Sequence, residues 1–176
     1  MKEKKDWIIC MVDKTKVINN VIKYMTEVLE VPREEFSGLA PCPFAKAERT
    51  KGRLMIDVFD PAQGNFVEKV KEMENKGYSS GVFAVFQGEE PVELSADDTK
   101  KFQIFINKTL RLAGMKRFKN ICFNPNDKPS INGFCPRGLA PYLLINVAKR
   151  DDLEKAHKNL QKTSYYDNLN EEYKKF

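Results

Sequence analysis

Two hydrophobic periodicities alternate along this chain, and their alternation limits the fold more than any other sequence feature. Apolar residues at every second position in 53–59 predict a strand, and the short apolar run 81–86 predicts a buried strand. The segments on either side carry apolar residues at helical spacing. We therefore predict an α/β (α+β) fold of one domain, 1–176, with a mixed sheet of about four or five strands covered by helices.

Capping residues and prolines indicate where the expected helices and strands begin and end. Asn65 with Glu68 and Ser95 with Asp98 have the spacing of helix capping boxes, and Pro43 fits the first turn of a helix. Residues 1–6 form a charged end that we expect to fray, and 7–12 fit either a strand or a helix. The further expected strands are 118–123 and 142–147, and the expected helices are 13–31, 43–50, 65–76, 95–113, 151–160 and 165–176.

Hydropathy and cysteine usage indicate a cytoplasmic protein. No apolar run approaches the roughly 20 residues that span a bilayer, and no signal-peptide pattern is present, so we expect no membrane partner. The four cysteines are then expected to be reduced thiols, and none belongs to a Cys-x-x-Cys pair. The net charge of +5 is mild and permits an anionic ligand.

A cysteine between two prolines, in the stretch 38–46, is the first candidate for chemistry. Cys42 precedes Pro43 and is expected to be the N-cap of a helix, facing free backbone N–H groups. The helix dipole, Lys46 and Arg49 would then lower the pKa of the thiol and make a reactive thiolate. The alternative is a small buried side chain with a structural role only, which is how free cysteine usually behaves.

A second proline-rich stretch, 135–142, shares Gly-Leu-Ala-Pro and a Cys-Pro pair with the first. We expect the two loops to border one pocket for a small anionic molecule, with arginines holding the anion and aromatic rings forming the walls. Any catalysis would be oxidoreductase-like and would use Cys42. The expected binding residues are Phe44, Lys46, Arg49, Asn124, Cys135, Arg137 and Tyr142.

The only histidine, His157, lies on an apolar helical stripe with Leu153 and Leu160. A buried histidine in such a place usually serves a structural hydrogen bond. The alternatives are a general base or a haem ligand, or the fourth ligand of a metal site made with Cys42, Cys122 and Cys135.

The segment 38–45 resembles the Gly-Leu-x-x-Cys-Pro-Phe-Ala segment of a family of small, uncharacterised bacterial proteins. Segments 102–107, 123–125 and 140–144, followed by Arg150, are similar to that family in the same order, so the resemblance spans Gly38 to His157. The layout is also distantly similar to a family that includes haem-dependent guanidine N-hydroxylases, which implies haem as an alternative cofactor.

The chain departs from the first family at two histidine positions. Asn124 stands where the family has the histidine of Phe-His-Pro, and the strand at 144–146 lacks a second histidine. Asparagine is a poor ligand for haem iron or zinc, because its amide offers a weakly basic oxygen and no nitrogen lone pair. We therefore predict no cofactor and no metal.

A function from another class rests on the helix and strand start at 95–119. Its cations suit a non-catalytic module that binds nucleic acid or an acidic partner, whereas a solvated helix face is the simpler interpretation. Salt-sensitive affinity for nucleic acid would favour the binding module. The basic residues are Lys100, Lys101, Lys108, Arg111, Lys116, Arg117 and Lys119.

Overall fold

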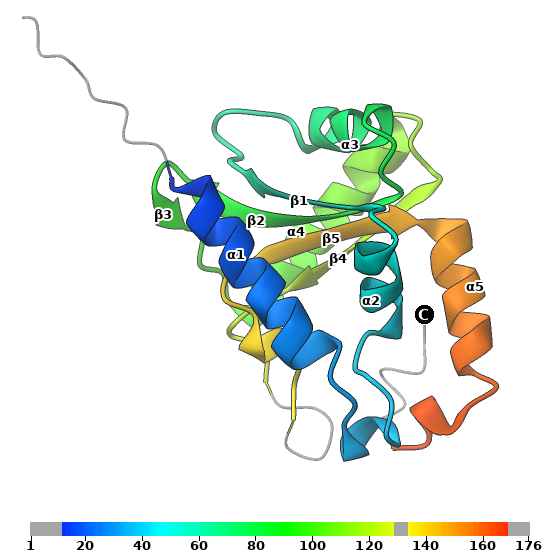
Figure 1. Cartoon of the computed structure of the whole chain (residues 1–176). Helices are drawn as coiled ribbons and strands as arrows, with labels where there is room; N and C mark the ends of the chain where they lie inside the picture. Colours follow the sequence, from blue (N-terminus) through cyan, green and yellow to red (C-terminus); the bar gives the residue numbers. More distant parts are fainter. Residues whose placement is uncertain (1–11, 129–133, 169–176) are drawn as a thin grey trace, which may run out of the picture.

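The computed structural model describes residues 12–128 and 134–168, which form a mixed sheet between two layers of helices (Figure 1). The predicted α/β fold with a mixed, helix-covered sheet is confirmed. The strands are β1 (Leu54–Phe59), β2 (Ser80–Gln87), β3 (Glu90–Pro91), β4 (Phe118–Phe123) and β5 (Leu144–Lys149). The α-helices are α1 (Lys14–Tyr24), α2 (Pro43–Thr50), α3 (Phe66–Asn75), α4 (Ala96–Leu112) and α5 (Arg150–Leu160).

Short helical turns complete the described chain. A π-helical turn, η1 (Met25–Leu29), extends α1, and 3-10 turns form η2 (Glu34–Phe36), η3 (Arg137–Leu139) and η4 (Ser164–Tyr166). The predicted helix 165–176 is a 3-10 turn where it is described, and its remainder lies outside the described residues, as does the segment 7–11. No helix within 12–128 and 134–168 is long and apolar enough to cross a bilayer.

The main sheet has the strand order β1-β2-β5-β4. β1 and β2 run parallel, while β5 runs antiparallel to both of its neighbours. β2 is buried along almost its whole length, because helices cover both faces of this inner strand. After β2 the chain turns at Gly88, whose φ of 62° suits glycine, and the two-residue β3 pairs back onto it, a hairpin that the sequence did not predict.

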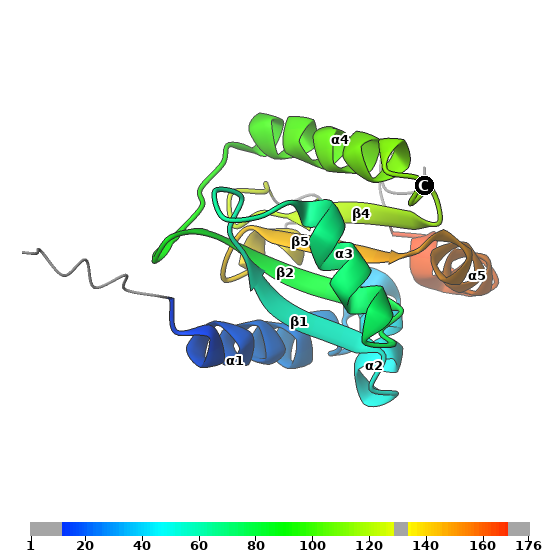
Figure 2. The ribbon, with the colours of Figure 1, turned by 90° about the horizontal axis from the view of Figure 1, so that it is seen from above.

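Alternate side chains of each strand enter two separate cores. Figure 2 shows α3 and α4 on one face of the sheet and α1 and α2 on the other. The α3/α4 core includes Phe83, Phe118 and Ile145, whereas the α1/α2 core includes Val82, Phe86 and Leu144. The period-two alternation of the sequence thus divides each strand between the two helical layers.

Polar caps begin the helices where the sequence predicts. The Asn65 side chain accepts a hydrogen bond from the Val67 N–H at 2.9 Å, and the Ser95 hydroxyl accepts one from the Asp98 N–H at 3.1 Å. Cys42 is the N-cap of α2, with Pro43 in the first turn. The Asn65 and Ser95 side chains thus satisfy N–H groups that have no partner inside the helix.

Side chains from α4 cover the exposed edge of the sheet at β4. The Asn107 amide accepts a hydrogen bond from the Asn120 N–H at 3.0 Å and donates one to the Asn120 carbonyl at 3.2 Å. The Gln103 side chain accepts a further bond from the Cys122 N–H at 2.8 Å. Two amide side chains thus replace a neighbouring strand, and an unpaired edge that would favour aggregation is covered.

One prediction for α4 is wrong in part: the sequence spacing places five residues on a single apolar face, namely Phe102, Phe105, Ile106, Leu110 and Ala113. Ile106 and Leu110 are buried as expected, but Phe105 is 62% exposed and Ala113 is also exposed. The amide side chains that bond to β4 occupy part of the helix surface that faces the sheet. The apolar arc that contacts the core is therefore narrow. Phe105 lies outside that arc.

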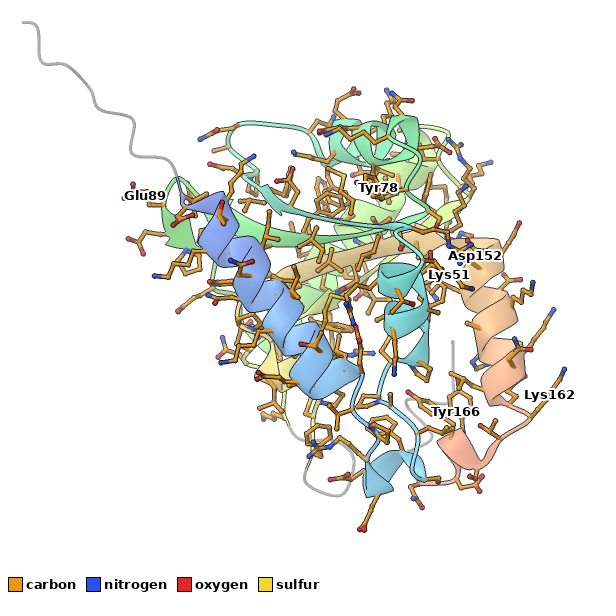
Figure 3. The ribbon with its side chains drawn as sticks, viewed as in Figure 1. Lys51, Tyr78, Glu89, Asp152, Lys162 and Tyr166 are labelled. Atoms are coloured by element: carbon orange, nitrogen blue, oxygen red, sulfur yellow. The ribbon has the colours of Figure 1, made fainter. Side chains whose placement is uncertain are left out.

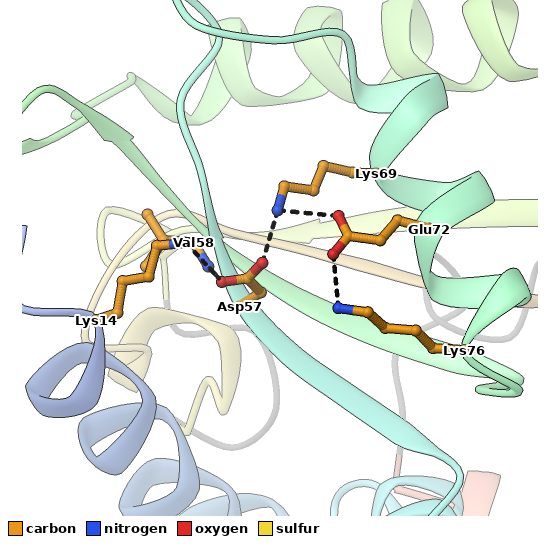
Figure 4. A network of polar contacts seen from close by, with 6 residues as sticks. All are labelled: Lys14, Asp57, Val58, Lys69, Glu72 and Lys76. Atoms are coloured by element: carbon orange, nitrogen blue, oxygen red, sulfur yellow. Dashed lines mark hydrogen bonds and ion pairs between the residues drawn. The ribbon is translucent and has the colours of Figure 1, made fainter.

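An ion-pair network joins the first strand to the two helical layers. Asp57 on β1 accepts a hydrogen bond from Lys69 of α3 at 2.6 Å and lies 3.5 Å from the amino group of Lys14 at the start of α1 (Figure 4). Burial alone would raise the pKa of Asp57. The hydrogen bonds from Lys69 and from the Val58 N–H, with the two positive charges, outweigh burial and lower that pKa.

This network predicts a pH-dependent contribution to stability. Because the pKa of Asp57 is lower in the folded state than the roughly 3.9 of a free aspartate, its contribution is complete above that pH and disappears as the pH falls through the folded-state value. We expect Asp57→Asn to lower the free energy of unfolding by roughly 1–2 kcal/mol at pH 7. The difference from wild type, measured by urea denaturation, should be smaller at pH 3 than at pH 7.

Glu68→Gln is the matched control, because it removes an exposed carboxylate that pairs with Lys71 on the helix surface. Exposed pairs contribute little, so this variant should stay within roughly 0.5 kcal/mol of wild type. A loss for Asp57→Asn that is the same at both pH values would show that packing, and not charge, is responsible.

Candidate functional site

A cavity of about 390 Å³ lies on the α2 side of the sheet, between β4, α5, η4 and the loop that leads into α2. Figure 3 shows the side chains of this region, with Tyr166 of η4 labelled. Most of the lining is apolar or aromatic, and it includes Leu29, Phe36, Phe44, Ile121, Phe123, Leu153, Leu160 and Tyr165. The charged side chains of the lining are Lys119, Arg137, Arg150 and Glu154.

Hydrogen bonds fix the loop that carries Cys42. The Cys42 N–H donates to the Leu29 carbonyl at 2.9 Å, which ties the loop to the end of η1. The hydroxyl of Tyr165 in η4 donates to the Pro41 carbonyl, which connects the same loop to the far wall of the cavity. With prolines on both sides, Cys42 is therefore held at one place in the wall.

The thiol of Cys42 does not have the predicted acidity. Burial raises its pKa above the ordinary value, and the charge of Glu30 acts in the same direction. Hydrogen bonds from the Ala45 and Phe44 N–H groups and the charge of Arg137 lower it, but they do not outweigh burial. The predicted depressed pKa is thus wrong, because removal from water disfavours the thiolate more than the first turn of α2 favours it.

The two cations expected to activate Cys42 lie elsewhere. The Nε and Nη2 atoms of Arg49 donate to the two oxygens of the Glu30 carboxylate, each at 2.7 Å, so the guanidinium is held in a bidentate ion pair. Lys46 is exposed on α2. Neither residue lines the cavity, and the predicted role of Arg49 in holding an anion is not supported by this geometry.

The second proline-rich loop does border the cavity, through η3. The Tyr24 hydroxyl donates to the Pro136 carbonyl at 2.6 Å and fixes the start of this turn. Arg137 then reaches the cavity, with its guanidinium carbon 5.7 Å from the ring centre of Phe123. Cys135 itself is buried and does not line the cavity. The loops that carry the two cysteines thus meet at one concavity.

His157 lies in the wall of the cavity with its ring nitrogens engaged. Its Nδ1 is 2.6 Å from the Tyr166 hydroxyl, and its Nε2 is 3.0 Å from the side-chain nitrogen of Gln161. The ring also packs edge-on against Tyr166, with 5.2 Å between ring centres. These contacts match the structural interpretation of His157 and join α5 to η4.

Two other predicted site residues serve the scaffold. Asn124 is buried and donates to the Leu94 carbonyl at 2.9 Å, which holds the end of β4 against the start of α4. Tyr142 accepts a hydrogen bond from Asn20 at 2.7 Å and packs on Phe86 in the α1/α2 core. Neither lines the cavity.

The alternative metal site with three thiolates is wrong. Cys122 points into the α3/α4 core, on the opposite face of the sheet from Cys42, and burial raises its pKa to about 12. Cys42, Cys122 and Cys135 are free cysteines. Within the described parts of the chain, no three or more His, Cys, Asp or Glu side chains gather so as to hold a metal ion.

Sequence reasoning missed the cations that line the cavity from β4 and α5. Lys119 alternates with Ile121 and Phe123, so the three side chains share one face of an edge strand. Arg150 begins α5, and its Nε donates to the Lys116 carbonyl at 2.7 Å. The alternation in 119–123 was a usable signal, but only the tertiary fold shows that this face meets a cavity.

Comparisons with protein-family models, with curated proteins and with solved structures found no match for this chain. The resemblance to the bacterial family with the Cys-Pro-Phe-Ala segment stays a prediction from the motifs.

The raised pKa of Cys42 predicts slow alkylation at neutral pH. We expect its rate of reaction with iodoacetamide to rise with pH to an inflection above the roughly 8.5 of a free thiol, because only the thiolate reacts. Peptide mass spectrometry would follow this cysteine separately from the others. Glu30→Gln should move the inflection to lower pH, because it removes a negative charge that raises the pKa.

An inflection below that of a free thiol would contradict this prediction and restore the reactive thiolate expected from the sequence. The matched control is Glu35→Gln, which removes a carboxylate that pairs with Arg33. Glu35 is not among the groups that shift the pKa of Cys42. This variant should leave the inflection of Cys42 unchanged.

Proposed function

We propose that the cavity binds a small organic anion with an apolar body. The observation that carries the proposal is a largely apolar cavity of about 390 Å³ with three cationic side chains and one carboxylate in its lining. This volume lies in the range of small-molecule sites, where apolar walls supply affinity and a few polar groups orient the ligand. Phe44 and Phe123 supply aromatic walls.

The charges in the cavity favour an anion. Lys119, Arg137 and Arg150 approach it from β4, η3 and the start of α5, and Glu154 is the opposing charge. Charge–charge attraction is stronger beside apolar walls than in open water, because the effective dielectric constant is lower there. A carboxylate, sulfonate or phosphate suits such a set of ammonium and guanidinium groups.

Binding, and not thiol catalysis, is the core of this proposal. The raised pKa of Cys42 keeps the thiol protonated at neutral pH, and a protonated thiol is a weak nucleophile. The ring nitrogens of His157 face the Tyr166 hydroxyl and the Gln161 side chain. The oxidoreductase-like reaction at Cys42 stays a hypothesis from the sequence.

The test uses two fluorescent probes that share one aromatic body. Anilinonaphthalene sulfonate carries an anionic group, and phenylnaphthylamine is its neutral counterpart. We expect wild-type protein to bind the sulfonate more tightly, and Lys119→Met to weaken that binding by roughly tenfold or more, because a hydrogen bond to a charged group contributes about 1.5–3 kcal/mol. The affinity for the neutral probe should change little.

Lys46→Met is the matched control, because Lys46 is an exposed lysine of α2 that does not line the cavity. It should leave both affinities unchanged. Equal binding of the two probes by wild type, or equal losses in the two variants, would contradict the proposal.

A second candidate function rests on the outer face of α4. Ile104, Phe105 and Leu112 are 67%, 62% and 79% exposed on this one helix. Lys101, Lys108 and further cations lie among them on the exposed surface. Phe105 is the one aromatic ring among these three side chains, and the aliphatic Ile104 and Leu112 do not stack on bases. This mixture therefore suits an acidic, amphipathic helix of a partner protein better than it suits nucleic acid.

A labelled helical peptide of leucine and glutamate would test this candidate by fluorescence anisotropy. We expect Phe105→Ala and Lys108→Glu each to weaken its binding by roughly tenfold, through lost apolar contact and through charge repulsion respectively. Lys51→Glu, an exposed change on α2, is the control and should have no effect. Tighter binding of an oligonucleotide than of the peptide would favour nucleic acid instead.

A further inference from the structure

A second, smaller cavity lies beneath α2, next to the first. Its volume is about 110 Å³, and its walls come from α2, η1 and the α1/α2 face of the sheet. We call it the inner chamber and call the larger cavity the outer chamber. The side chains found only in the inner chamber include Met25, Ala45, Leu54, Val82, Leu144 and Ala148.

The polar groups of the inner chamber already have partners. The Glu48 carboxylate accepts a hydrogen bond from Ser79 at 2.5 Å and pairs with Arg53. The Asn146 amide donates to the Ile121 carbonyl at 3.2 Å. A polar ligand group would therefore find no free hydrogen-bonding partner among the described residues there and would lose its hydrogen bonds to water. Binding an apolar group there is favourable, because it removes apolar surface from water.

The two chambers share part of their walls. Cys42, Phe44 and Lys119 line both, together with Leu29, Ile121, Phe123 and Leu153. The chambers therefore adjoin along this shared wall, where the stem of Lys119 is apolar enough to border a ligand chain. The charged residues Arg137 and Arg150 line the outer chamber alone.

We propose that the two chambers form one site for an unbranched aliphatic anion of the fatty-acid type. The anionic group lies in the outer chamber among the cations, and the end of the chain passes Cys42 and Phe44 into the inner chamber. This inference rests on the proposed function, because it names the ligand class of the same site.

The inner chamber sets a length preference. Its volume of about 110 Å³ holds roughly four methylene-sized groups, at the approximately 30 Å³ that one water molecule occupies in the liquid. Each buried methylene contributes about 0.8 kcal/mol, which is roughly a fourfold gain in affinity. Affinity should therefore rise with chain length until the chamber is full.

The experiment measures displacement of anilinonaphthalene sulfonate by butanoate, hexanoate, octanoate and decanoate. We expect wild-type affinity to rise roughly fourfold per added methylene over part of this series. Ala45→Leu fills the inner chamber and should weaken octanoate by about tenfold or more, while butanoate changes less than about twofold. Ala148→Val is a milder second variant and should act in the same direction.

Ala47→Leu is the matched control, because it makes the same substitution on α2 at a position that lines neither chamber. It should keep the wild-type length dependence. Affinities that do not depend on chain length, or equal effects of the variants at positions 45 and 47, would overturn this inference while leaving anion binding intact. Failure of the sulfonate to bind at all would overturn the proposed function itself.

Discussion

The antiparallel pairing of β5 with both β2 and β4 is the interaction on which the rest of the structure depends. It places a late segment of the chain in the interior of the sheet and leaves β4 at the edge. The edge position exposes the β4 backbone, which Asn107 and Gln103 of α4 then cover. Because α5 begins directly after β5, it lies beside the β4 face that carries Lys119, Ile121 and Phe123. There α5 forms one wall of the cavity.

The cavity exists because the inner side of α5 does not meet a packed core. No residue of α5 is fully buried, although Leu153, Ala156 and Leu160 lie along one side of it and line the cavity. Unfilled apolar space reduces stability, since the side chains around it lose contacts. A ligand that fills the space would stabilise the folded protein in proportion to its occupancy.

Burial decides the chemistry at Cys42. A helix N-terminus contributes about 0.3–1 kcal/mol to a nearby negative charge, and α2 is a short helix whose only basic residue in the last turn, Arg49, pairs with Glu30. Desolvation of a thiolate in an apolar wall is larger, and the pKa rises. The position of Cys42 at a helix N-terminus favours a thiolate, but burial of the thiol has the larger effect on its pKa.

The sequence by itself determined α1 to α5, the four long strands and the caps, because these depend on local periodicity and on residues such as Asn65, Ser95 and Pro43. It did not predict the short strand β3 or the 3-10 turn η4. It also indicated that the stretches around Cys42 and Arg137 would meet. Only the tertiary structure decided which side chains line the cavity: Lys119 and Arg150 came into it, while Arg49, Asn124 and Tyr142 went to scaffold contacts. The physical reason is that strand order and ion pairing bring together residues far apart in the chain. Local sequence patterns do not determine which of those residues meet.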